Sequence, residues 1–170
     1  HFTGEALDIE ELVDLGKWVE DILSAKTHLN LYYDRPIAFQ PLGKMFGQNG
    51  DGCGTCGILS ILGVLADGSY ALCGIGETIS DLVFGHAGVD ILEYVWTNTF
   101  VLQEIREELP QKLEGICGHC LMKEICLGSC LAQNYYRSQS LWKPFWFCEE
   151  AHNRGLFPET RIPPEKASTG

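Results

Sequence analysis

The sequence predicts an α+β fold in which a small β-hairpin, several helices and long loops surround a metal centre. Apolar residues recur at helical spacing in several stretches, and two short apolar runs flank an Asp-Gly turn pair. Four of the eight cysteines lie close together, in the order Cys117-x2-Cys120-x5-Cys126-x3-Cys130. Such crowding indicates an inorganic partner, because small apolar residues would fill a core without the oxidation liability of thiols.

Composition narrows the class of protein. The chain has 170 residues, 45% of them hydrophobic, which is enough for one modest core. Its net charge of -11 predicts no nucleic-acid partner and no anionic membrane partner, because phosphate groups would be repelled. The sequence contains neither a long apolar run nor a basic segment of the kind that opens a signal peptide. We therefore expect a cytoplasmic protein without a transmembrane span.

Three explanations are possible for the eight cysteines: disulfides, a metal framework, or reduced thiols without a ligand. Disulfide-rich secreted proteins are usually smaller and have scattered cysteines, so the bunching favours metal. A C-x2-C turn holds two thiolates within reach of the same iron or zinc ion. Cys126 and Cys130 stand at i and i+4. If that turn is helical, their sulfurs serve one centre or are divided between two.

A helix is predicted over residues 8–26. Asp8 precedes apolar residues at helical spacing, and Glu11 stands where a capping box requires it. Residues 28–33 alternate apolar and polar side chains before the turn signal at 34–36, which indicates a strand. A helix followed by a strand is half of a βαβ unit, so the absent first strand suggests a truncated chain.

Residues 43–57 form a glycine-rich segment that carries Cys53 and Cys56. Its glycines would let backbone N–H groups approach sulfur closely, and the alternative is a flexible linker. Residues 58–73 are predicted to form a hairpin, because Asp67-Gly68 favours a type I′ turn. That turn returns Cys73 toward Cys53 and Cys56, so three sulfurs are expected to converge.

Helices are also predicted over residues 90–97, 99–109 and 126–137, from their apolar spacing. Aromatic residues crowd the segment before Cys148, either as ordinary core or as an apolar cover for a metal cluster. The proline-containing tail, residues 158–170, is expected to be extended or disordered.

The histidines are weaker candidates. His119 lies inside the C-x2-C turn, where it is a ligand, a hydrogen-bond donor or an exposed spacer; the abundance of cysteines favours the spacer. His28, His86 and His152 have no partner motif, which favours structural or surface roles. Asp67 is accounted for by its turn. No Ser-His-Asp arrangement or carboxylate pair is indicated by spacing, so no catalytic residue is assigned.

Taken together, the spacings of the cysteines resemble those of a known domain family. Their order is Cys56, eleven residues, Gly68, four residues, Cys73, a gap, the Cys117–Cys130 motif, a gap and Cys148. This resembles the seven-cysteine pattern of the SPASM domain of radical S-adenosylmethionine enzymes, over residues 53–150. Residues 8–42 are similar to the last helix and strand of the partial TIM barrel that precedes this domain. The resemblance implies a barrel remnant (1–42), a SPASM domain (43–157) and a tail (158–170).

The resemblance also implies two auxiliary [4Fe-4S] clusters as cofactors. The first would be held by Cys53, Cys56, Cys73 and Cys130. The second would be held by Cys117, Cys120, Cys126 and Cys148. Cys126 and Cys130 would then leave the same helical turn for different clusters. Only two residues separate Cys53 from Cys56, closer than the family pattern places its first two ligands. An open or differently ligated iron is therefore an alternative at Cys53.

The family's C-x3-C-x2-C motif, which binds the cluster that cleaves S-adenosylmethionine, does not occur in this sequence. S-adenosylmethionine is therefore expected only in the full enzyme or a partner, with the radical catalytic domain in cis or in trans. Enzymes resembled here mostly modify ribosomally made peptides or proteins. The leading hypothesis is an electron-transfer and substrate-docking part of a peptide maturase. The alternatives are a stand-alone cluster-bearing peptide-binding module and a structural zinc module.

Overall fold

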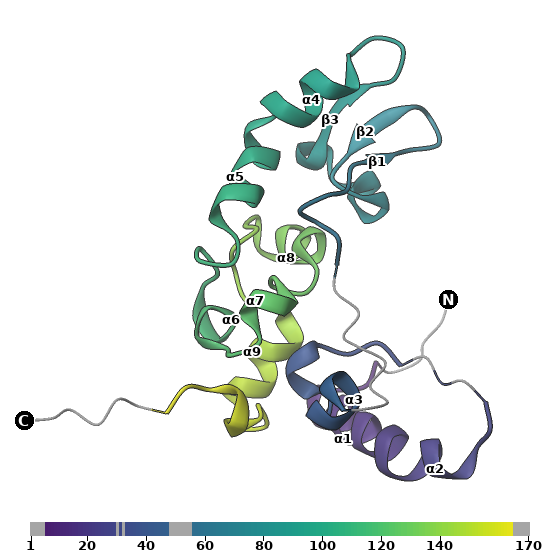
Figure 1. Cartoon of the computed structure of the whole chain (residues 1–170), viewed down its shortest axis with the longest axis vertical. Coiled ribbons are helices and arrows are strands. Elements are labelled where there is room, and N and C mark those ends of the chain that lie inside the picture. Colours follow the sequence, from purple (N-terminus) through teal and green to yellow (C-terminus); the bar gives the residue numbers. More distant parts are fainter. Residues whose placement is uncertain (1–5, 30, 32, 48–55, 165–170) are drawn as a thin grey trace, which may run out of the picture.

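The computed structural model describes residues 6–29, 31, 33–47 and 56–164. The molecule is elongated: a small sheet and α4 lie at one end, α6–α9 in the middle and α1–α3 at the other end (Figure 1). The strands are β1 (Gly63–Val64), β2 (Ser69–Ala71) and β3 (Val83–His86). The α-helices are α1 (Ile9–Trp18), α2 (Ser24–Lys26), α3 (Leu42–Phe46), α4 (Leu92–Asn98), α5 (Phe100–Glu108), α6 (Gly115–His119), α7 (Lys123–Cys126), α8 (Leu131–Ser138) and α9 (Trp146–Asn153). The mixture of helices with a small antiparallel sheet confirms the α+β class.

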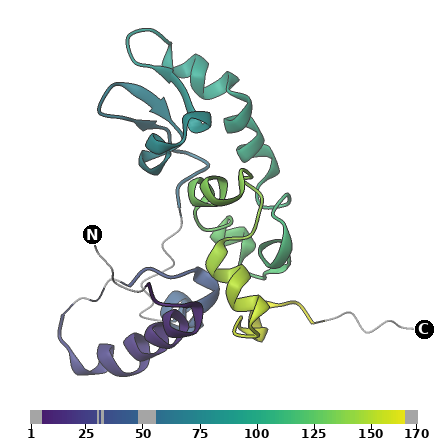
Figure 2. The ribbon, with the colours of Figure 1, turned by 180° about the vertical axis from the view of Figure 1, so that it is seen from behind.

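The first predicted helix is confirmed, including its cap. The Glu11 N–H donates to Asp8 Oδ1 and the Asp8 N–H donates to Glu11 Oε2, both at 2.9 Å. This reciprocal pair satisfies two N–H groups that the first turn leaves free. α1 continues through a π-helical segment (Val19–Leu23) into α2, so the helix spans residues 9–26. Its buried face, Ile9 and Val13, packs on α9, which lies between α1 and the α6–α8 region in both views (Figures 1 and 2).

The strand predicted at residues 28–33 is not present in the described residues of that segment. A strand needs a hydrogen-bonded neighbour, and β1, β2 and β3 pair with one another in a separate sheet. Tyr33 instead turns back onto the first helix, where its hydroxyl donates to the Leu12 carbonyl oxygen at 3.1 Å. The predicted helix is therefore present, and the predicted strand is not seen among these residues.

The predicted hairpin is confirmed, but its turn type was wrong. β1 and β2 pair antiparallel with Val64 opposite Tyr70, and β3 joins on the other side of β2. The loop has three residues, 66–68, closed by the Leu65 N–H donating to Ser69 O at 2.8 Å. Only Gly68 has a positive φ there, at +93°, whereas a type I′ turn needs two such residues. Asp67 stabilises the loop through its side chain, which accepts the Ser69 N–H at 2.8 Å.

The main core lies between the sheet and the helices that follow it. α4 and α5 confirm the two helices predicted at 90–97 and 99–109, within two residues at each end. Leu102 and Ile105 of α5 pack in the same buried cluster as Leu72, Leu82 and Leu131. Cys117, Cys120 and Cys148 are buried in this cluster, and Cys73, Cys126 and Cys130 pack against it partly buried.

The helix predicted at 126–137 begins only at Leu131, because the chain turns between α7 and α8. Leu127 and Ser129 adopt the left-handed conformation, with φ of +52° and +63°, and Gly128 has φ of +79°. Left-handed residues end a right-handed helix. Cys126 therefore closes α7 and Cys130 caps α8, and the two do not share a helical turn.

The tail prediction was wrong up to the end of the described chain. Residues 159–161 form a 3₁₀ turn, and the Leu121 N–H donates to Arg161 O at 2.9 Å. Phe157 is 6% exposed and Arg161 is 7% exposed, so this segment is anchored in the core. The glycine-rich segment starts in α3, and its residues 48–55, including Cys53, lie outside the described part. No helix described here has the length and apolar character needed to cross a bilayer.

Candidate metal centre

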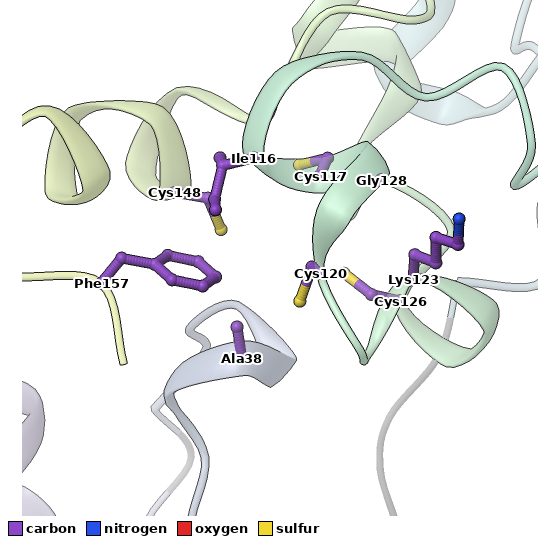
Figure 3. Close-up of a pocket in the computed structure, with 9 residues that line it drawn as sticks. All are labelled: Ala38, Ile116, Cys117, Cys120, Lys123, Cys126, Gly128, Cys148 and Phe157. Atoms are coloured by element: carbon purple, nitrogen blue, oxygen red, sulfur yellow. The ribbon is translucent and has the colours of Figure 1, made fainter. Parts of the chain in front are cut away.

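Four thiols line one cavity at the junction of α6, α7 and α9 (Figure 3). We call them the cavity thiols: Cys117, Cys120, Cys126 and Cys148. They are the four cysteines that the resemblance assigns to the second cluster. Residues from distant segments, Ala38 and Phe157, complete the wall. The fold thus brings sulfurs from the 117–126 motif together with one from α9.

Short elements place these sulfurs. Cys117 lies in the one-turn helix α6, Cys120 caps that helix, and Cys126 is the last residue of α7. Gly115 starts α6 with φ of +53°, and a Cβ there would lie 2.6 Å from Pro144 Cγ, so glycine is required at this approach. Cys148 lies on the buried side of α9.

Backbone N–H groups point at the sulfurs. The Phe145 N–H donates to Cys117 Sγ at 3.4 Å, and the Met122 N–H donates to Cys120 Sγ at 3.3 Å. The backbone N–H groups of Ser129 and Ile37 also act to lower the pKa of Cys126, although the Ser129 N–H donates its hydrogen bond to Cys126 O, at 3.0 Å. Hydrogen bonds donated to sulfur stabilise a thiolate and are one determinant of cluster reduction potential.

The cavity thiols disfavour one another's ionisation. Burial, followed by the nearby charge of Cys117, raises the pKa of Cys126 to about 11. A hydrogen bond from Cys148 lowers the pKa of Cys117, and the same bond, with burial, raises the pKa of Cys148. Four thiolates cannot coexist here without a cation, which is what a bound metal supplies.

A second group of thiols lies at the end of the hairpin. We call Cys56, Cys73 and Cys130 the hairpin thiols. Cys56 is exposed, yet partial burial of its sulfur raises its pKa, as do the charges of Cys130 and Cys73, despite an opposing hydrogen bond from the Ile58 N–H. Cys73 and Cys130 therefore each lie within electrostatic range of Cys56. The hairpin thiols are the described members of the predicted first-cluster set, whose fourth member, Cys53, lies outside the described residues.

The thiols are gathered without converging on one point. In the described ranges no three His, Cys, Asp or Glu side chains are positioned to hold a single metal ion. The free volume between the cavity thiols is about 10 Å³, roughly enough for one water molecule. The donor set suits an iron–sulfur cluster or zinc. A four-iron cluster requires the surrounding side chains to move apart.

The histidines of the described residues lie outside both thiol groups. His119 is exposed and its Nδ1 lies 2.8 Å from Gly115 O, which agrees with a spacer role. His28, His86 and His152 are also exposed. Sequence reasoning missed the contribution of Ala38 and Phe157 to the cavity wall, because no spacing pattern connects them to the cysteines.

Comparison of the chain with protein-family models, with curated proteins and with solved structures gave no match in any of the three.

Proposed function

We propose that this chain is a SPASM-type auxiliary domain that holds two [4Fe-4S] clusters and serves a radical S-adenosylmethionine enzyme that modifies a peptide. The observation that carries the proposal is the set of cavity thiols. Four cysteines that the resemblance assigns to one cluster line one cavity, although Cys148 lies on α9, far in sequence from the other three. Unrelated thiols would not be expected to sort in this way.

The hairpin thiols support the division into two sites. Cys130 and Cys73 each interact with Cys56, whereas Cys126, four residues before Cys130, lines the cavity. The left-handed residues between them separate the two sulfurs. This division is the one that two clusters with interleaved ligands require.

The surrounding residues suit electron transfer. When bound, an iron–sulfur cluster supplies one-electron redox chemistry. The N–H groups of Phe145 and Met122 favour the more negative state by donating to sulfur. Ala38 and Phe157 cover the cavity with apolar surface, which limits the access of water. The chain's role is therefore to hold and tune electron carriers and to dock a peptide or protein substrate.

The catalytic step belongs to a partner domain. Since the chain has no C-x3-C-x2-C motif, S-adenosylmethionine is bound by a radical catalytic domain in cis or in trans. We propose a cytoplasmic setting, without a nucleic-acid or membrane partner, in keeping with the net charge of -11. A stand-alone peptide-binding module would carry the same two clusters.

Zinc is the competing occupant, because four thiolates also suit a tetrahedral zinc site. A zinc ion needs all four sulfurs about 2.3 Å from one point. In the described chain no three thiols are arranged to hold a single ion. Four thiols that do not converge on one point suit a cluster, in which each binds a separate iron, once the surrounding side chains have moved apart.

The deciding experiment measures iron, acid-labile sulfide and zinc per chain in protein purified without oxygen under iron-replete conditions. About eight iron and eight sulfide per chain are expected for two four-iron clusters. About two zinc ions without sulfide would overturn the proposal and make the chain a structural zinc module.

A further inference from the structure

Arg161 is a buried cation without a carboxylate partner in the described chain. Only 7% of the residue is exposed, and none of the ion pairs formed by the described residues includes it. Its Nη2 donates to Gln40 O at 3.1 Å and its Nη1 to Thr160 Oγ1 at 3.2 Å, whereas Nε has no partner. Burying a cation without a negative partner is costly, so its position calls for a compensating charge.

That charge is available at the cavity thiols. The carbonyl oxygen of Arg161 accepts the N–H of Leu121, the residue directly after Cys120, at 2.9 Å. Phe157, four residues earlier on the same segment, lines the cavity. Burial raises the pKa of Cys120, and the guanidinium charge opposes that rise. Backbone contact and charge both place Arg161 beside the Cys120 wall of the cavity.

We propose that Arg161 is the counter-charge of the second cluster and raises its reduction potential. The inference rests on the proposed function, since it requires a cluster on the cavity thiols. A cluster held by four thiolates becomes more negative when it is reduced. A buried positive charge nearby therefore stabilises the reduced state more than the oxidised state, and water screens it little.

Lys123 is the other cation at this cavity. Its amine donates to Gly118 O at 3.1 Å, and its side chain is directed away from the sulfurs in Figure 3. The residue is only half-buried, so solvent screens its charge more than that of Arg161. Arg161 is therefore the cation expected to dominate the potential, and it acts as a positioning and tuning residue rather than as a ligand.

The test compares reduction potentials of the loaded full chain, followed by electron paramagnetic resonance during redox titration. In Arg161→Gln, the reduced-to-oxidised ratio of one cluster at a fixed potential is expected to fall about tenfold, equivalent to about 59 mV for a one-electron couple. Arg161→Lys, which keeps the charge, is expected to restore most of the shift. Arg154→Gln is the matched control, because Arg154 is 48% exposed and pairs with Asp8 and Glu10 on the surface.

A second variant covers the case in which Arg161→Gln loses its cluster. Thr160→Glu keeps the arginine but places a carboxylate at the side chain that accepts its Nη1, so it is expected to lower the same potential. If Arg161→Gln binds its clusters and their potentials are unchanged, the proposal is overturned. If that variant does not bind them, unchanged potentials in loaded Thr160→Glu overturn the proposal. Wild-type protein without iron and sulfide would instead overturn the proposed function itself.

Discussion

Cys126 and Cys130 are four residues apart, yet the structure places them in different thiol groups. Cys126 lines the cavity with three other sulfurs, and Cys130 interacts with Cys56 at the end of the hairpin. Replacing each by alanine, singly and together, therefore tests the division directly. We expect Cys126→Ala to remove the second cluster and Cys130→Ala to remove the first.

The expected loss of iron follows from the cluster that each cysteine would bind. Each four-iron cluster accounts for about four of the roughly eight iron atoms expected per chain. Each single variant should retain about four, and the double variant should retain about none. Where a single variant keeps part of its cluster, the two losses should still add in the double variant, because independent sites contribute independently.

The assay is iron and sulfide analysis of oxygen-free protein, with spectra of the reduced clusters. Gln133→Ala is the control, because Gln133 is exposed on α8, close to both cysteines in sequence. It should retain the full iron content. A double variant that loses no more iron than either single variant would show that both cysteines serve one cluster, which would refute the division.

Three further predictions concern stability, measured as the free energy of unfolding in urea. Gly68→Ala should cost more than Gly88→Ala, because both have a positive φ, costing about 1–2 kcal/mol, but only at Gly68 would the new Cβ lie 3.0 Å from the His86 ring. Asp8→Ala should cost about 0.5–2 kcal/mol through loss of the capping box. Phe157→Ala should cost about 3–5 kcal/mol, because a buried aromatic ring is removed from the core.

Matched variants make these tests specific. Asp21→Ala lies on an exposed part of the same helix and should change the free energy of unfolding by less than about 0.5 kcal/mol. Tyr136→Ala should behave similarly, because Tyr136 is 68% exposed. Equal costs for the Gly68 and Gly88 variants would show that the His86 contact is relieved by side-chain movement. A Phe157 variant as stable as the Tyr136 variant would contradict the anchored position of the tail.

Local signals in the sequence were sufficient to predict the elements that are stabilised by interactions between residues close in sequence. The capping box of α1 involves residues three apart, and α4 and α5 follow their apolar spacing. The predicted strand at 28–33 failed because alternation describes one strand, whereas pairing needs a neighbour that the pattern does not identify. The Asp-Gly pair correctly located the hairpin, but loop length decided the turn type.

Within the candidate site, too, some features were predictable from the sequence and others were not. The four sulfurs that line the cavity together are the ones that the family resemblance groups, whereas spacing alone left open whether Cys126 and Cys130 share a centre. The break between Cys126 and Cys130 was missed, since Leu127 and Ser129 adopt a left-handed conformation that their residue types do not favour. Ala38 and Arg161 were also missed, because tertiary contacts from both ends of the chain bring them to the cavity.

The two thiol groups overlap along the chain, since Cys130 of one lies between Cys126 and Cys148 of the other. With both sites loaded, the chain forms two closed loops, residues 56–130 and 117–148, that share the segment 117–130. A protease cut at the exposed stretch around Val89 and Ile91 falls inside the first loop only. The two fragments would then remain joined through iron and sulfur and migrate as one particle until the clusters are removed, after which packing alone would hold them.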